Sequence, residues 1–198
     1  MFWDRMAGIY DLYQVVERKV NDEAAAICAS YLHEDDTVLE CACGTGIMTR
    51  VLAPACGRLI ATDYSRRMLR RCWEKVRGQA NVTLRYADIT AIRCRDSCFD
   101  AAVAANVIHL LDDPDRALDE LRRVVKPGGL LLLPTYVAQE NARATAVTSV
   151  FRAMGTQFPR QFSRESYRQF FAERGIAAEY RMVRGLVPCC VAVIRVEK

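Results

Sequence analysis

The stretch that decides the fold of this chain is TVLECACGTG, at residues 37–46. Residues 37–41 are mostly apolar, as in a buried strand, and the small residues at 42–46 predict a loop. A helix is expected over 47–53, where Pro54 ends it. The stretch therefore predicts strand, loop and helix in succession, which is the repeating unit of an α/β fold.

The alternation of strand and helix continues as far as residue 134. Repeated in this way, it predicts a parallel sheet with helices on both faces. An amphipathic helix over about 16–31 precedes the first strand. Further strands are expected at 58–62, 81–86, 99–104 and 130–134, with helices capped by Ser65 and Asp113 between them.

The pattern changes after residue 134. Helices are expected at about 138–154 and 163–173, and strands follow at 176–183 and 189–196. Adjacent strands joined by so short a turn must be antiparallel. The sequence therefore predicts an α/β fold, with a Rossmann-like, doubly wound and mostly parallel sheet that ends in an antiparallel β-hairpin.

Length and composition favour one domain over residues 1–198. Apolar residues make up 52% of the chain, which is enough for a sizeable core. No apolar run approaches the ~18 residues of a membrane span, and the N-terminal residues lack a signal pattern, so a cytoplasmic protein is expected. The nine cysteines show no metal-ligand spacing, which favours buried thiols over a zinc or redox site and predicts no bound metal.

Positive charge is concentrated near the C-terminus. The net charge is +4, and residues 152–198 hold nine basic and four acidic side chains. Such a segment could attract an anionic substrate or a nucleic acid. We expect a small-molecule partner and consider nucleic acid the weaker alternative; the oligomeric state is not predicted.

Several polar side chains follow the predicted strands, where a doubly wound sheet binds its ligands. A carboxylate at Asp63 could accept hydrogen bonds from both hydroxyls of a ribose, and one at Asp88 could accept a bond from an adenine amino group. Tyr64, Met68 and Ile89 could enclose the purine ring. The competing interpretation is that the two acids cap helices or end loops, and that Met68 belongs to the core.

Taken together, these segments resemble the motifs of class I S-adenosylmethionine-dependent methyltransferases. The resemblance covers roughly residues 36–135, and it implies S-adenosylmethionine as cofactor, S-adenosylhomocysteine as product and the sheet order 3-2-1-4-5-7-6. Ala42 stands where the family usually has its first glycine, and it should admit the cofactor if its φ is negative. The matching segments are 38–46, 61–65 with Met68, 86–88, 99–100 and 121–129.

The resemblance also implies roles for individual residues. Glu40 and Asn106 would lie near the methionine end of the cofactor, and Asp63 would bind its ribose. Asp88 and Ile89 would lie at the adenine. The loop residues that would surround the cofactor are Ala42, Gly44, Thr45 and Gly46.

Two segments could cover the site. Residues 1–13 resemble the start of the ubiquinone/menaquinone-biosynthesis methyltransferases, and they belong to an expected N-terminal helical cap at 1–31. We expect Tyr10 to lie over the cofactor and residues 136–162 to form a lid that lines the acceptor pocket. The alternative is that both segments complete the core.

His109 is the candidate general base, because its neutral form is available near pH 7. The alternative is a structural histidine. Two other functions compete with methyl transfer. One is an S-adenosylmethionine-binding regulatory module without catalysis, and the other is a nicotinamide-dependent dehydrogenase, which the loop fits poorly because Thr49 stands at its third glycine position. Oxygen, carbon, sulfur and alkyl nitrogen all remain open as the methylated atom.

Overall fold

The computed structural model describes residues 18–137 and 160–197. Most of the expected N-terminal cap, including Tyr10, and most of the expected lid therefore lie outside the described residues. The helices and short 3₁₀ helices are α2 (Arg18–Ala29), α3 (Ile47–Leu52), η1 (Ala53–Ala55), α4 (Arg66–Val76), η2 (Ile108–Leu110), α5 (Pro114–Val124) and α7 (Arg164–Ala172). The strands are β1 (Thr37–Cys41), β2 (Arg58–Asp63), β3 (Val82–Tyr86), β4 (Phe99–Ala104), β5 (Val125–Tyr136), β6 (Glu179–Val183) and β7 (Cys189–Arg195).

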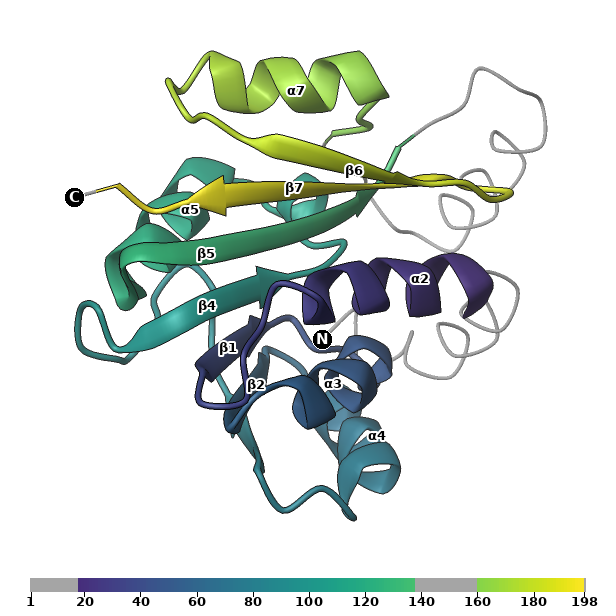
Figure 1. Ribbon diagram of the computed structural model, residues 1–198, viewed down its shortest axis with the longest axis vertical. Coiled ribbons are helices and arrows are strands. Elements are labelled where there is room, and N and C mark those ends of the chain that lie inside the picture. Colours follow the sequence, from purple (N-terminus) through teal and green to yellow (C-terminus); the bar gives the residue numbers. More distant parts are fainter. Residues whose placement is uncertain (1–17, 138–159, 198) are drawn as a thin grey trace.

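These strands form one seven-stranded sheet in the order β3-β2-β1-β4-β5-β7-β6 (Figure 1). Strands β1 to β5 pair in parallel, whereas β7 is antiparallel to both β5 and β6. The predicted fold class, strand order and terminal hairpin are confirmed. Because β1 lies between β2 and β4, the strand order changes direction beside β1, and the glycine loop follows this strand.

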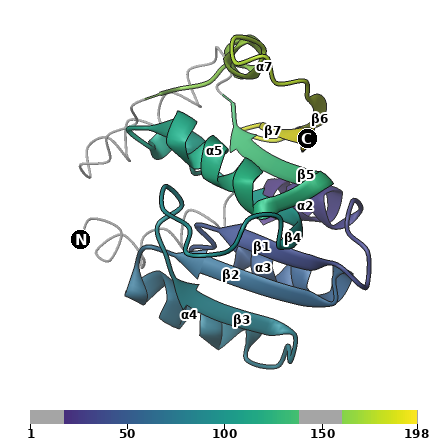
Figure 2. The ribbon, with the colours of Figure 1, turned by 90° about the vertical axis from the view of Figure 1, so that its left-hand side faces the viewer.

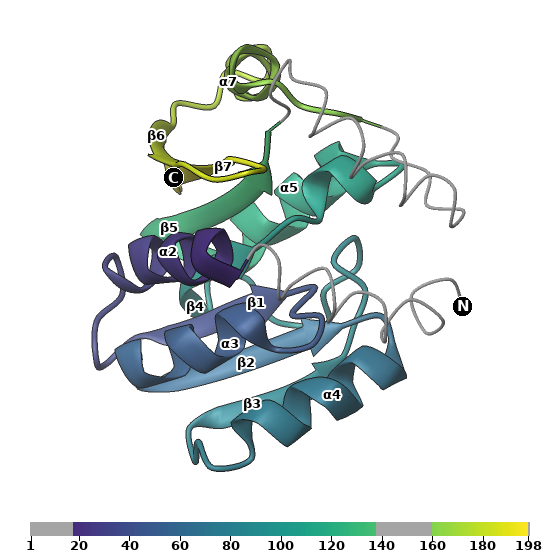
Figure 3. The same cartoon turned by 90° about the vertical axis from the view of Figure 1, so that its right-hand side faces the viewer.

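Helices cover both faces of the sheet, as the alternating pattern predicted. Helices α2, α3 and α4 lie on one face, and α5 lies on the other (Figures 2 and 3). One apolar cluster joins α5 and α7 to the sheet, and a second joins α2 and α3 to it. The end of the expected lid also belongs to the core, since Phe162 is buried with its ring 5.0 Å from that of Tyr167.

The strand expected at 130–134 begins five residues earlier, because the glycines that suggested a turn form an irregularity within β5. Phe99 pairs with Val125, but Ala101 pairs with Leu130, so the register shifts between them. Gly128 has a φ of 83°, and a Cβ atom on Gly129 would lie 2.5 Å from the carbonyl oxygen of Asp100. Gly128 is therefore needed for its left-handed backbone, and Gly129 for the close approach of β4.

The cysteines behave as expected for buried thiols. Seven of the nine are buried, and all nine are free. Burial raises the pKa of the Cys41 thiol to about 12, so it stays protonated at neutral pH. Within residues 18–137 and 160–197, no helix is long and apolar enough to span a membrane, and no three side chains of the metal-binding types come together.

Candidate active site

A pocket opens at the carboxyl ends of β1 and β4, beside the N-terminal end of α3. It brings together Glu40 at the end of β1, the loop that follows, and Asn106 after β4. This is the edge of the sheet at which the sequence predicted a ligand. The lining residues are Asn21, Glu40, Ala42, Cys43, Gly44, Thr45, Ile47, Met48, Ala105 and Asn106.

The loop after β1 takes a left-handed course. The φ angles of Ala42, Gly44 and Gly46 are 55°, 53° and 84°. The condition of a negative φ at Ala42 is therefore not met, and the position has the conformation that suits a glycine. An L-residue in this region carries strain of about 1–2 kcal/mol because its Cβ crowds the backbone. The loop is nevertheless held in place, since Cys43 N–H donates to the carbonyl of Thr62 at 2.9 Å.

Replacing Ala42 with glycine is therefore expected to stabilise the protein by about 1 kcal/mol, because the left-handed strain disappears. Thermal unfolding would show this as a melting temperature raised by roughly 3 °C. Ala53 is the matched control, since its φ is −56° and glycine should there lower stability. Loss of stability in Ala42→Gly would show that the loop is not strained.

Glu40 is the most unusual group in the pocket. Its side chain is 1% exposed, and within the described chain its Oε2 atom has no hydrogen-bond partner. Burial raises the pKa of Glu40 to about 8, with smaller contributions from Cys72 and Asp63, and hydrogen bonding to Thr49 offsets only part of the rise. A buried carboxyl group with an unsatisfied oxygen at a pocket wall is suited to a cationic ligand.

Asp63 links the ends of β1 and β2. Its Oδ2 accepts a hydrogen bond from Gly44 N–H at 2.8 Å, and its Oδ1 accepts one from Ser65 N–H at 2.8 Å. The side chain is only 9% exposed. The carboxylate thus holds the glycine loop against β2, and a carboxylate oxygen can accept more than one hydrogen bond. Thr45, also in the loop, accepts a hydrogen bond from Lys75 Nζ at 2.9 Å.

The expected adenine-binding residues follow β2 and β3. Asp88 Oδ1 accepts hydrogen bonds from both the backbone N–H and the hydroxyl of Thr90, each at 2.8 Å. Ile89 and Met68 are buried, with exposures of 9% and 3%. Tyr64 is instead 51% exposed. Its ring lies 5.1 Å from the ring of Tyr86, which is exposed at the end of β3. Tyr86 was not among the site residues predicted from the sequence.

Asn106 is held by β5 at the rim of the pocket. It has a φ of 51°, and its Oδ1 accepts a hydrogen bond from Tyr136 N–H at 2.9 Å. The hydroxyl of Tyr136 donates to Asn21 Oδ1 at 2.6 Å. Sequence analysis missed Asn21, although one signal was present: it is a polar residue on the apolar face of α2, where it is 5% exposed.

His109 lies in η2, outside the set of residues that lines the described pocket. Burial lowers the pKa of His109 to about 4. The imidazole is therefore neutral at pH 7, as expected, but it is a much weaker proton acceptor than an ordinary histidine. This favours the structural role over general-base catalysis.

We accordingly expect the His109 imidazole to show no titration between pH 5.5 and 8. Nuclear magnetic resonance of the ring protons, assigned by comparison with His109→Gln, would measure this. A titration midpoint near 6.5 would contradict the burial argument and return His109 to candidacy as the base.

The comparisons with known proteins agree with this geometry. Residues 39–133 match the family model described as "Methyltransferase domain". This part of the chain is therefore similar to a methyltransferase domain. The stretch that matches the family model contains the loop, Asp63, Asp88 and Asn106.

Particular relatives extend the comparison. The chain is 36% identical over 136 residues to the ubiquinone/menaquinone biosynthesis C-methyltransferase UbiE of Acidiphilium cryptum, covering 64% of this chain and 54% of the relative. It is 29% identical over 134 residues to the demethylmenaquinone methyltransferase of Clavibacter sepedonicus, covering 66% and 55%. The chain therefore spans about half the length of these relatives. A solved S-adenosylmethionine-dependent methyltransferase from Aquifex aeolicus has the same fold, with a TM-score of 0.73 and 21% identity over 94% of this chain and 97% of that one.

Proposed function

We propose that the protein transfers a methyl group from S-adenosylmethionine to a small-molecule acceptor, and that the Glu40 pocket holds the methionine end of the cofactor. The observation that carries this proposal is the unsatisfied Oε2 of Glu40 at the pocket wall. The ammonium group of the methionine moiety is a cation that can donate to this oxygen. Such a contact would stabilise the charged carboxylate and lower its pKa again.

The remaining site residues are assigned along the cofactor from this anchor. Asn106 would lie beside the methionine moiety, and Asp63 would accept the ribose hydroxyls. Asp88 would accept from the adenine amino group, with the purine ring bordered by the side chains of Tyr64, Met68 and Ile89. The backbone of the loop 42–46 would pass close to the cofactor at Gly44, which has no Cβ atom in the way. At Gly46 a Cβ atom would instead lie 2.7 Å from Sγ of Cys72.

The chemistry needs little from protein side chains. When bound, the cofactor supplies a methyl group on a sulfonium, which leaves as a neutral thioether when the acceptor attacks in line. The chain binds and orients the two reactants, and orientation alone can supply ~7–11 kcal/mol of barrier reduction. No general base is assigned, because the pKa of His109 is too low for efficient proton transfer at pH 7. We propose that residues 1–13, with Tyr10, and residues 136–162 help to close the site.

Release of S-adenosylhomocysteine tests the proposal. The purified protein is incubated with S-adenosylmethionine labelled in its methyl group and fractions of a small-molecule extract. We expect label to move into a small molecule, with one S-adenosylhomocysteine formed per methyl transferred. Calorimetry should show binding of S-adenosylmethionine and none of NAD. Tight cofactor binding without transfer to any fraction would favour the regulatory module instead.

A further inference from the structure

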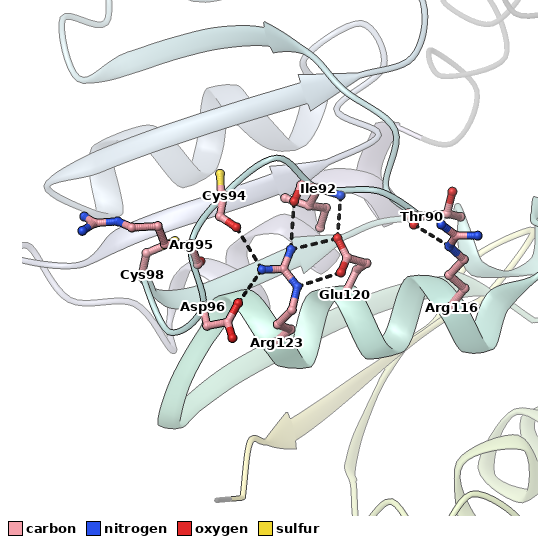
Figure 4. Close-up of polar contacts among 9 residues, drawn as sticks. All are labelled: Thr90, Ile92, Cys94, Arg95, Asp96, Cys98, Arg116, Glu120 and Arg123. Atoms are coloured by element: carbon pink, nitrogen blue, oxygen red, sulfur yellow. Dashed lines mark hydrogen bonds and ion pairs between the residues drawn. The ribbon is translucent and has the colours of Figure 1, made fainter.

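The loop between β3 and β4, residues 87–98, is held by side chains of α5. This loop contains Asp88 and Ile89 but no regular helix or strand. Arg116, Glu120 and Arg123 are spaced four and three residues apart, so they project from one face of α5. Figure 4 shows all three side chains turned toward the loop.

Among these three side chains, Arg123 makes the most contacts with the loop. Its NH2 nitrogen donates to the carbonyl of Ile92 at 2.8 Å, and its NH1 nitrogen donates to the carbonyl of Cys94 at 2.9 Å. NH1 also pairs with the carboxylate of Asp96 at 2.7 Å. Most of these bonds go to backbone oxygens of the loop (Figure 4). Arg123 therefore fixes the path of the loop backbone, whichever side chains the loop carries.

Glu120 completes this arrangement. Its Oε1 accepts from Nε of Arg123 at 2.7 Å, and its Oε2 accepts from Ile92 N–H at 2.6 Å. The Arg123 guanidinium, together with the Ile92 N–H, holds the pKa of Glu120 below its usual range. The two side chains therefore form hydrogen bonds with both the N–H and the carbonyl of Ile92. Charge-assisted bonds of this type are stronger than neutral ones.

A further hydrogen bond from α5 reaches the part of the loop next to the proposed adenine site. Nε of Arg116 donates to the carbonyl of Thr90 at 2.9 Å. The N–H and hydroxyl of the same Thr90 donate to Oδ1 of Asp88. A continuous series of hydrogen bonds thus connects the face of α5 with the carboxylate of Asp88.

From these contacts we propose that Arg123, with Glu120, is a positioning residue for adenine recognition: it holds the loop so that Asp88 and Ile89 meet the base. This inference rests on the proposed function, which places adenine at those two residues. Arg123 does not itself touch the cofactor. Its removal should therefore reduce the discrimination between bases more than it reduces binding of the rest of the cofactor.

The test compares S-adenosylhomocysteine with S-inosylhomocysteine, whose base has a carbonyl in place of the amino group. Calorimetry on the wild type should show about 10-fold tighter binding of the adenine form, the equivalent of one hydrogen bond to a charged acceptor. In Arg123→Ala this ratio should fall to about 2 or less. Hydrogen exchange at residues 90–98 should become faster in the same variant.

Arg122→Ala is the matched control, because Arg122 is an exposed neighbour on the same helix, and its ratio should stay at the wild-type value. Arg116→Ala removes one contact only, and it provides a milder variant with the same direction of change if Arg123→Ala does not fold. An unchanged ratio in folded Arg123→Ala, or in Arg116→Ala if Arg123→Ala does not fold, would overturn the positioning role while leaving the proposed function intact. A wild type that binds both compounds equally would overturn both the adenine assignment and the positioning role.

Discussion

Replacing Glu40 with glutamine is expected to weaken the binding of S-adenosylmethionine by about 100-fold, which is the cost of losing one buried, charged hydrogen bond. Glutamine has nearly the shape of glutamate, so the pocket keeps its form. Its neutral amide cannot balance the ammonium group of the methionine moiety. Calorimetric titration of S-adenosylhomocysteine, which has the same ammonium group, measures the loss without turnover.

The same substitution should have the opposite effect on the ligand-free protein. The folded-state pKa of Glu40, about 8, is higher than its ordinary value of 4.5. Between these two values the folded state keeps a proton that the unfolded state releases, so the wild type loses stability as the pH rises from about 4.5 to about 8. Glutamine carries no such penalty. Above pH 8, Glu40→Gln should therefore be more stable by up to about 5 kcal/mol, which thermal unfolding would detect.

Glu34→Gln serves as the control, since Glu34 is exposed and outside the pocket. It removes the same charge and should change neither affinity nor stability appreciably. A Glu40→Gln protein that binds S-adenosylhomocysteine as tightly as the wild type would remove Glu40 from the cofactor site. Equal melting temperatures at pH 9 would show that the carboxyl group is not buried at a cost.

The second large effect is expected from Asp63→Ala, which should weaken cofactor binding by ~2–4 kcal/mol. Two losses combine here. The ribose hydroxyls lose their acceptors, and Gly44 N–H loses the carboxylate that ties the glycine loop to β2. The loop is then free to move away from the cofactor. Calorimetry with S-adenosylhomocysteine measures the total.

The two losses can be separated with the 2′,3′-dideoxy form of S-adenosylhomocysteine. The wild type should bind it much more weakly than the natural product, whereas Asp63→Ala should distinguish the two poorly. Glu74→Ala is the control for removal of an acid, because Glu74 lies exposed on α4. If Asp63→Ala still prefers the natural product as strongly as the wild type does, another residue binds the ribose.

The elements most predictable from the sequence were those with strong local signals. The strand at 37–41 was predicted to the residue, because an apolar run is followed at once by small loop residues. The caps of α4 and α5 were also predicted, and Ser65 and Asp113 do accept the capping bonds from Met68 and Arg116 N–H. Asp63 could be placed at a strand end, but its two bonds to backbone N–H groups depend on the fold.

Other features depend on contacts between distant parts of the chain. The glycines at 128 and 129 suggested a turn, yet the approach of the Asp100 carbonyl keeps them within β5. The left-handed φ of Ala42 reflects the loop's attachment to Thr62, which no local pattern reveals. Asn21 enters the pocket only because α2 packs beside β7 and α3. The pKa of Glu40 likewise follows from burial by several elements at once.

The measurement that tests the central claim most directly is a calorimetric cycle on the amino group of the cofactor. S-adenosylhomocysteine and its analogue without the amino group are each titrated into the wild type and into Glu40→Gln. If Glu40 binds the ammonium group, loss of the amino group should weaken binding to the wild type by about 100-fold but change binding to Glu40→Gln by less than about 5-fold. If the amino group contributes equally to both proteins, Glu40 does not bind it, and the placement of the cofactor in this pocket is wrong.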